Sequence, residues 1–219
     1  KLGSKGWRKS MGIHTYFRSL NELERIFRCP GKFKFEVHTV AAHSWKVVQY
    51  AKTLADIEEK NGASIDWKKL YEITSSHDYG EIFIGDIKTP VKHSSMELRS
   101  LIQQVEEGMI NNFIKEHIPE EFKSIFYNQL REGKDDSIEG LILEVADKMD
   151  QVYEAFTELQ RGNTEKEFVV MYRNALVKIK NINLKCVDYF LETILPDMVN
   201  EETIYSIDIK RITEEALAL

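Results

Sequence analysis

The sequence contains little of several features that mark particular classes of protein. Among its 219 residues there are four prolines and two cysteines. The cysteines, Cys29 and Cys186, lie far apart and in none of the spacings that bind zinc or form redox pairs, so we expect two reduced thiols in a cytoplasmic protein. No apolar run approaches the roughly 20 residues that cross a bilayer, which excludes an integral membrane protein.

The charged residues show no excess of basic groups. The formal net charge is -6, and acids and bases are interspersed along the chain. Because a nucleic-acid surface needs a basic patch or stripe, we expect no polymeric nucleic acid as a partner. A small phosphorylated substrate stays open, since a metal ion and one or two local cations can attract it.

The domain organisation is simple. Residues 1–10 are polar and basic and lack the apolar segment of a signal peptide, so we expect a tag remnant or a disordered tail there. The rest of the chain, 11–219, has no low-complexity linker and no internal repeat. The sequence therefore predicts a single domain over these residues.

Apolar residues recur at helical spacing through nearly the whole chain, and the alternating runs typical of strands are absent. Capping residues mark several helix starts: Thr39 and Asp66 suit N-caps, Ser94 with Glu97 forms a capping box, and Asp136 begins another helix. The sequence predicts an all-α, single-domain helical bundle. Its expected helices lie over about 17–27, 39–60, 66–77, 94–113, 119–133, 136–162 and 164–196.

The adjacent pair His77-Asp78 is the most informative feature of the sequence. It places an imidazole nitrogen and a carboxylate oxygen within reach of one cation, at the end of a predicted helix. Two residues elsewhere complete a candidate set: His43, on the apolar stripe of the helix over 39–60, and Asp147, in the helix over 136–162. Since helical bundles build metal sites from side chains on facing helices, these four residues are candidate ligands.

Each candidate ligand also has a simpler interpretation. A histidine on an apolar stripe, such as His43 or His77, is more often a hydrogen-bonded core residue than a ligand. Asp147 shares its face with Asp150 and Glu154, so this face is equally consistent with a solvated acidic surface. The carboxylate next to His77 favours the metal site, because burying it without a cation or several donors is costly.

Two imidazoles and two carboxylates suit one divalent transition metal, namely Mn²⁺, Fe²⁺, Co²⁺ or Zn²⁺, and the pattern does not choose among them. Such an ion polarises a phosphate and activates a water at neutral pH. The sequence thus indicates chemistry on a phosphate ester, in which water is the nucleophile.

Three further residues are candidates for roles beside the metal. Glu81 lies three residues after Asp78 and is the candidate for proton transfer, with Asp86 as an alternative. Arg28 is the candidate for a bidentate clamp on phosphate, helped by Lys92. The simpler interpretations are a surface acid for Glu81, a turn residue beside glycine for Asp86, and a residue at a helix C-terminus for Arg28.

Together these residues resemble the HD phosphohydrolase superfamily, whose signature is H…HD…D on an all-helical scaffold. The similarity extends to the YfbR-like bacterial 5′-deoxynucleotidases, over most of the chain from about Tyr16 to Pro196. Many phosphohydrolases share the H…HD…D skeleton, whereas the GD-x-x-TPVK stretch is much more specific. The matching segments are Arg28-Cys29-Pro30, His77-Asp78 followed by Glu81, Gly85-Asp86-Ile87-Lys88-Thr89-Pro90-Val91-Lys92, and Ala146-Asp147.

The resemblance implies a helical bundle of the HD-domain type that hydrolyses 2′-deoxyribonucleoside 5′-monophosphates to the deoxynucleoside and phosphate. It also implies a homodimer and a small-molecule nucleotide substrate. The implied metal ligands are His43, His77, Asp78 and Asp147, and the implied phosphate-binding and catalytic groups are Arg28, Glu81 and Asp86.

The sequence departs from the family pattern at two positions. Cys29 stands where familiar members have a tryptophan between the arginine and the proline. A bulky ring there could sense the 2′ position of the sugar, so Cys29 is a candidate substrate-binding position that bears on the choice between deoxy and ribo substrates. Ala42 stands where familiar members have an acid just before the first ligand, which removes no ligand.

Three rival functions stay open at this point. One keeps the metal site but changes the substrate to another nucleotide or phosphate ester. A second is a catalytically silent nucleotide-binding regulatory dimer, and the intact set of ligands together with Glu81 argues against it. The third is a helical scaffold without a metal, which requires every simpler interpretation above to hold at once.

Overall fold

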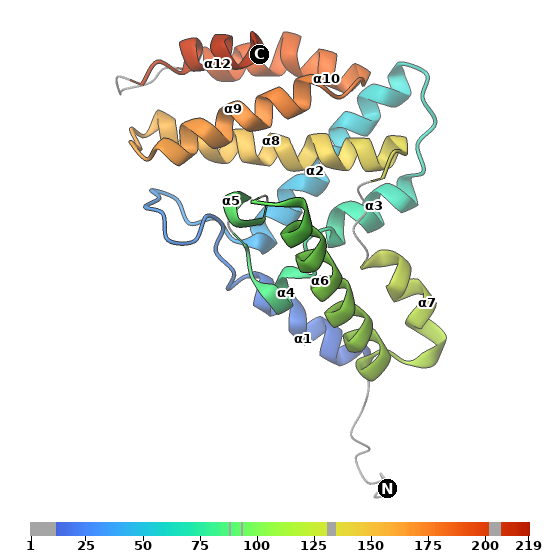
Figure 1. Ribbon diagram of the computed structural model, residues 1–219. Helices are drawn as coiled ribbons and strands as arrows, with labels where there is room; N and C mark the ends of the chain where they lie inside the picture. The colour runs from blue at the N-terminus through green and yellow to red at the C-terminus, as the bar shows by residue number, and fades with distance from the viewer. Residues whose placement is uncertain (1–11, 88, 93, 131–134, 202–206) are drawn as a thin grey trace, which may run out of the picture.

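The computed structural model describes residues 12–87, 89–92, 94–130, 135–201 and 207–219. These residues form helices and no strand, and the one β-bridge among them joins Phe27 to Thr39 (Figure 1). The predicted all-α class is therefore confirmed. None of the helices in the described ranges combines the length and the apolar content needed to cross a membrane.

Most helices follow one another with short connections, but a long connection over 24–39 joins the first two. In chain order they are α1 (Ile13–Leu23), α2 (Val40–Lys60), α3 (Trp67–Ser76), α4 (Glu81–Ile84), α5 (Thr89–Lys92), α6 (Met96–His117), α7 (Glu120–Gln129), α8 (Ile138–Gln160), α9 (Lys166–Lys180), α10 (Lys185–Tyr189), a π-helix (Phe190–Ile194), α11 (Leu195–Val199) and α12 (Ile209–Leu217).

The central element is α8, which packs against α2, α3, α9 and α12 (Figure 1). Ser137 caps its first turn by accepting a hydrogen bond from the Gly140 N–H. Most of its apolar residues are buried and they lie on several faces, as expected for a helix with neighbours on most sides. The main core includes Ile142, Val145, Ala146, Val152 and Leu159 of α8.

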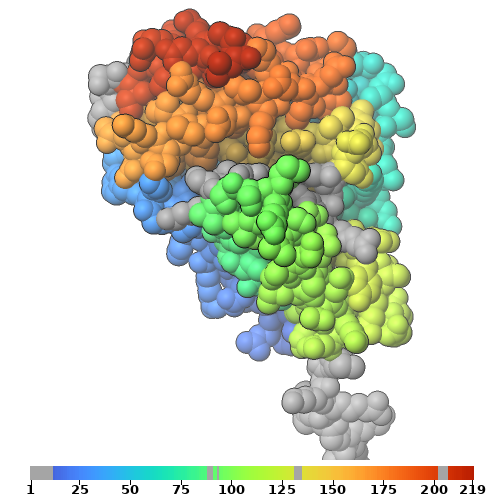
Figure 2. Space-filling view, viewed as in Figure 1, coloured from blue at the N-terminus to red at the C-terminus, as the bar shows by residue number. Residues whose placement is uncertain are grey.

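A second, smaller core lies between α1, α4, α6 and α7. Tyr79 is buried there against Phe113 and Ile114 of α6, and its hydroxyl lies 2.7 Å from Ser19 Oγ of α1. In the space-filling view, residues of α6 form the front of the lower half of the molecule (Figure 2). This unit covers the end of α3, where His77 and Asp78 lie.

Several predicted helix boundaries were wrong by one or a few residues. The N-cap of α6 is Ser95, not Ser94, and that of α8 is Ser137, not Asp136. Pro119 precedes α7 instead of occupying its first helical position. For α6 and α8 a neighbouring serine provides the cap, so the sequence locates these starts only approximately. The predicted end at Gly133 lies outside the described residues.

Two segments differ more strongly from the predictions. The first helix ends at Leu23, because Phe27 continues as extended backbone that pairs with Thr39. The helix predicted over 164–196 is interrupted after Lys180 and restarts at Lys185. It then passes through a π-helix ahead of Pro196, whose missing N–H removes one backbone hydrogen bond.

Candidate metal centre

The four predicted metal ligands come from three helices that pack on one another. His43 lies in the first turn of α2, His77 is the C-cap of α3, Asp78 follows it, and Asp147 lies in the middle of α8. His43, His77 and Asp147 are buried. Since α2 and α3 both pack against α8, their side chains reach the same point in the interior.

The structure brings the ligand atoms of these four side chains together. His43 Nε2 lies 3.1 Å from His77 Nε2, 3.1 Å from Asp78 Oδ2 and 3.5 Å from Asp147 Oδ1. His77 Nε2 lies 3.4 Å from Asp78 Oδ2. Two imidazole nitrogens and two carboxylate oxygens thus face one point, which is a donor set that a divalent transition ion accepts.

In each histidine, the hydrogen bond made by Nδ1 determines whether Nε2, which faces the candidate metal site, carries a proton or a lone pair. His77 Nδ1 lies 2.9 Å from the carbonyl oxygen of Thr74, which can only accept a hydrogen bond. His43 Nδ1 lies 2.7 Å from Asp150 Oδ2, again an acceptor. Both Nδ1 atoms therefore carry the proton of a neutral imidazole, and both Nε2 atoms present lone pairs to each other. Two facing lone pairs fit a bound cation.

In the absence of a cation, a proton can occupy this site. Burial and the charge of Arg28 lower the pKa of His43, but its hydrogen bonds to Asp150 and Asp78 raise it to about 9. The pKa of Asp78 is held well below its ordinary value: burial alone would raise it, and the two histidines more than offset that. Metal binding to these groups at neutral pH is consequently coupled to proton release.

Asp150 is a buried residue of the candidate site that the sequence analysis did not propose for any role. It is fully buried, and its Oδ2 lies 2.7 Å from His43 Nδ1 and 3.0 Å from His38 Nε2. The face of α8 that carries Asp147, Asp150 and Glu154 is thus buried and not a solvated acidic surface. The available signal was the spacing of three and seven residues from Asp147, which places all three acids on one helix face.

We expect the Asp150→Asn variant to bind metal about 10- to 100-fold more weakly, the range found when partners of metal-binding histidines are removed. The amide holds the His43 ring less firmly than the carboxylate does. The measurement is a titration of the metal-stripped protein with Co²⁺, followed by visible absorption. Asp56→Asn, on the exposed side of α2, is the matched control and should bind like the wild type.

Glu81 begins α4, and its N–H donates to the carbonyl oxygen of Asp78 at 3.1 Å. Its Oε2 atom is buried and has no hydrogen-bond partner among the described residues. Burial, followed by the charges of Asp78 and Asp86, raises the pKa of Glu81 to about 8. This oxygen lies near the candidate ligands, is buried and has no partner among the described residues. It can therefore form a hydrogen bond with a water or a substrate.

Arg28 reaches the centre from the segment before α2, and Cys29 follows it in the chain. Arg28 Nη1 lies 3.6 Å from Asp78 Oδ2, which places its guanidinium next to a candidate ligand. Cys29 adopts a left-handed backbone with φ of 54°, and its N–H donates to Asp86 Oδ2 at 3.1 Å. Asp86 therefore holds the turn that carries Arg28. Burial and Glu154 raise the pKa of the Cys29 thiol to about 12, so it is not a nucleophile at neutral pH.

Two lysines complete the description. Lys92 ends α5 and has no hydrogen bond or ion pair within the described ranges, so its role beside the phosphate stays a prediction. Lys148, which the sequence analysis did not single out, donates to Asp147 Oδ2 at 3.0 Å. Because Asp147 presents its other oxygen to His43, Lys148 orients this carboxylate.

Comparison with known proteins identifies the family. The model of the YfbR-like 5′-deoxynucleotidases matches residues 15–198. The chain belongs to this family. Among its relatives, the 5′-deoxynucleotidase of Erwinia tasmaniensis is 26% identical over 207 residues, which cover 94% of this chain and 100% of that protein. The 5′-deoxynucleotidase YfbR of Escherichia coli is 25% identical over 182 residues, which cover 83% of this chain and 90% of the relative.

Solved structures agree with the HD-type fold of this YfbR-like protein. An HD-domain phosphohydrolase from Listeria innocua superposes with a TM-score of 0.90 at 48% identity, covering 94% of this chain and 99% of the other. The cyanophage S-2L HD phosphohydrolase DatZ superposes with a TM-score of 0.57 at 14% identity, covering 83% of this chain and 95% of the other. This second likeness concerns the fold alone. The predicted superfamily and the prediction of a hydrolase are therefore confirmed.

Proposed function

We propose that this YfbR-like protein hydrolyses nucleoside 5′-monophosphates, with 2′-deoxyribonucleotides as substrates, to the nucleoside and inorganic phosphate. One divalent transition metal, held by His43, His77, Asp78 and Asp147, is the proposed cofactor. The observation that carries the proposal is the convergence of their donor atoms, 3.1–3.5 Å from His43 Nε2. The names of the Erwinia and Escherichia relatives support the substrate class.

A further observation on the same fold supports a metal and a nucleotide. The structure of the cyanophage phosphohydrolase DatZ is described as bound to dA and one catalytic Zn²⁺ ion. In this chain, His43, His77 and Asp147 form a group that could hold a metal ion, and Asp78 Oδ2 lies 3.1 Å from His43 Nε2. These are nitrogen and oxygen donors that Zn²⁺, Mn²⁺, Fe²⁺ and Co²⁺ accept.

The geometry supports a proposed role for several of the chain's own residues. The chemistry that a bound ion supplies is polarisation of the phosphate and acidification of a water. Arg28, beside Asp78, binds phosphate oxygens and offsets their charge, with Lys92 as a second cation. Glu81 carries the proton, because its buried Oε2 has no partner within the described residues. Asp86 fixes the turn at Cys29.

A panel of phosphate esters tests the substrate class. We expect phosphate release from paired 2′-deoxy and ribo 5′-monophosphates and none from phosphodiesters. Since Cys29 stands where familiar members of the family have a bulky tryptophan, we expect the two sugars to differ by less than about tenfold in kcat/KM. Cleavage of phosphodiesters without cleavage of monophosphates would show that the substrate is another ester. Nucleotide binding without any turnover would favour a silent regulatory protein.

The proposed assembly is a homodimer in a reducing compartment such as the cytoplasm. The proposed dimer surface on α6 consists of three exposed apolar residues that recur every four positions, Leu101, Val105 and Met109. The reducing compartment is proposed because both cysteines are free thiols. We expect light scattering to give twice the mass of one chain for the wild type. For Val105→Glu we expect the mass of one chain. A wild-type mass of one chain would contradict the dimer.

A further inference from the structure

One buried carboxylate of α8 has no part in the mechanism above. Glu154 lies seven residues after Asp147 and is 4% exposed. Its Oε2 lies 3.4 Å from Arg28 Nε, and its Oε1 accepts a hydrogen bond from Lys34 Nζ. Cys29 Sγ lies 3.8 Å from the same Oε1. One carboxylate therefore connects α8 to three side chains of the segment that leads into α2.

The charge of Glu154 matters most for Arg28. The Arg28 side chain is 11% exposed, and a buried guanidinium needs an anionic partner. Burial lowers the pKa of Arg28, but the charges of Glu154 and then of Asp78 more than offset it, and the net shift is upward. Among the carboxylates around Arg28, Glu154 contributes most, so it is the main counter-ion of Arg28.

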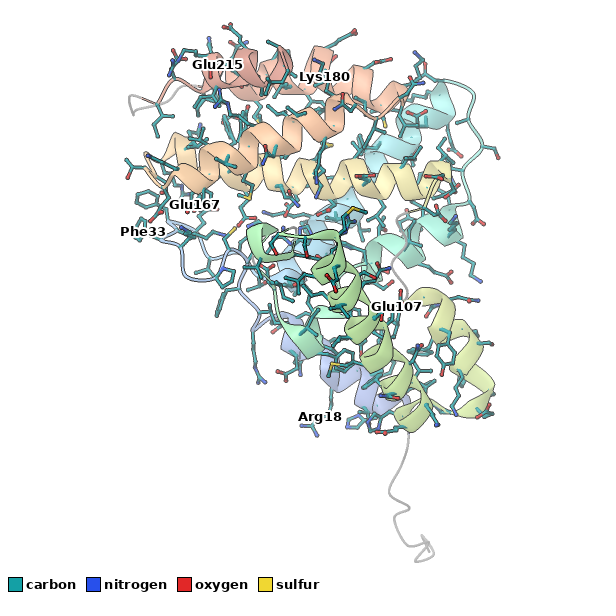
Figure 3. The ribbon with its side chains drawn as sticks, in the orientation of Figure 1. Arg18, Phe33, Glu107, Glu167, Lys180 and Glu215 are labelled. Carbon is teal, nitrogen blue, oxygen red and sulfur yellow. The ribbon has the colours of Figure 1, made fainter. Side chains whose placement is uncertain are left out.

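Other contacts, separate from Glu154, hold the backbone of this segment. The Arg28 N–H donates to the carbonyl oxygen of His38 at 2.9 Å. One turn beyond Glu154, Glu158 accepts from the N–H groups of Phe35 at 2.9 Å and Glu36 at 3.0 Å. Lys32 pairs with Glu167 of α9. Figure 3 labels Glu167 and Phe33, the residue that follows Lys32, on the same side of the molecule. Loss of the Glu154 charge therefore changes the Arg28 side chain more than the path of the chain.

We infer that Glu154 is a positioning residue that aims the Arg28 guanidinium at the substrate phosphate. The inference rests on the proposed function, because it needs Arg28 to contact phosphate. Of the five N–H donors of a guanidinium, Nε faces Glu154 and Nη1 faces Asp78, so the remaining donors stay available for phosphate oxygens. The fork geometry of arginine makes its orientation decisive for binding an anion.

The isosteric Glu154→Gln variant tests this role, with inorganic phosphate as the probe. We expect the inhibition constant for phosphate and the KM for a deoxynucleoside monophosphate to rise about tenfold each, the equivalent of one lost charge-assisted contact. The affinity for Co²⁺ should stay within about threefold, since Glu154 contacts no ligand. Glu121→Gln, an exposed change of the same kind on α7, is the matched control and should keep the wild-type inhibition constant.

A double-mutant cycle separates positioning from general damage. In the Arg28→Met background, adding Glu154→Gln should change the phosphate inhibition constant by less than about twofold, because the residue acts through Arg28. If Glu154→Gln lowers the stability of the protein, this comparison still shows whether Glu154 acts through Arg28. An unchanged constant in Glu154→Gln, an equal loss in Glu121→Gln, or a further loss in the double variant would overturn the inference. A wild-type protein that releases no phosphate would instead contradict the proposed function.

Discussion

Replacing Asp78 by alanine is expected to reduce phosphate release at least about 1,000-fold, equivalent to roughly 4 kcal/mol of activation free energy. Asp78 Oδ2 lies 3.1 Å from His43 Nε2 and 3.4 Å from His77 Nε2. The variant therefore removes one of the four candidate metal ligands. The loss also leaves Arg28 without one of its two carboxylate partners. The initial rate of phosphate release and the metal content per chain should fall together. The metal content is measured by atomic spectroscopy.

The matched control for this variant is Asp56→Ala. Asp56 is an exposed aspartate on α2, away from the ligands, and its variant should retain wild-type rates and metal content. Helical content measured by circular dichroism should be the same in both variants. An Asp78→Ala protein that keeps more than about a tenth of the wild-type rate would remove Asp78 from the mechanism.

The second large effect is expected at Glu81. Glu81→Gln keeps the size of the side chain but cannot transfer a proton, so kcat should fall by about 10²- to 10⁴-fold, the usual contribution of a general acid or base. Metal affinity should stay close to the wild type, because Glu81 is not among the four converging ligands. Steady-state kinetics and a Co²⁺ titration on the same protein give both quantities.

Glu121→Gln, an exposed change in the first turn of α7, is the control for Glu81→Gln and should leave kcat unaltered. If Glu81→Gln lost metal and activity in parallel, Glu81 would be acting on the ligands and not on the proton. If the variant kept both, Asp86 would be the next candidate, although its contact with the Cys29 N–H indicates a structural role.

The central residues of the site could be predicted from the sequence because their chemistry is local. His77 and Asp78 are adjacent, and Asp66 begins the helix that ends at His77. Thr39 accepts a hydrogen bond from the Ala42 N–H, which starts α2 at the residue expected and places His43 in its first turn. Helix period and capping chemistry therefore locate these ligands without tertiary information.

The supporting carboxylates could not be predicted in the same way. Asp150 and Glu154 look like a solvated face of α8 when they are considered alone, since acids are seldom buried without partners. Their partners lie more than 100 residues earlier, as the separation of 112 residues between His38 and Asp150 illustrates. Only the tertiary structure places these cations and imidazoles against α8.

The end of the chain shows a second limit of the sequence pattern. Apolar residues keep a helical period through Cys186, Val187 and Phe190, so one long helix was predicted. The structure ends α9 at Lys180, and Glu58 of α2 accepts a hydrogen bond of 2.6 Å from the Cys186 N–H at the start of α10. A distant buried carboxylate thus takes up an N–H group that the break leaves free.

The most direct test of the account is reconstitution of the metal-stripped protein with single ions. Phosphate release from a deoxynucleoside 5′-monophosphate would be followed after adding Mn²⁺, Fe²⁺, Co²⁺ or Zn²⁺ in separate reactions. The account predicts no activity without metal, recovery with at least one ion at one ion per chain, and no recovery in Asp78→Ala. Full activity in the stripped protein, or tight binding of an ion at the four ligands without turnover of any phosphate ester, would contradict it.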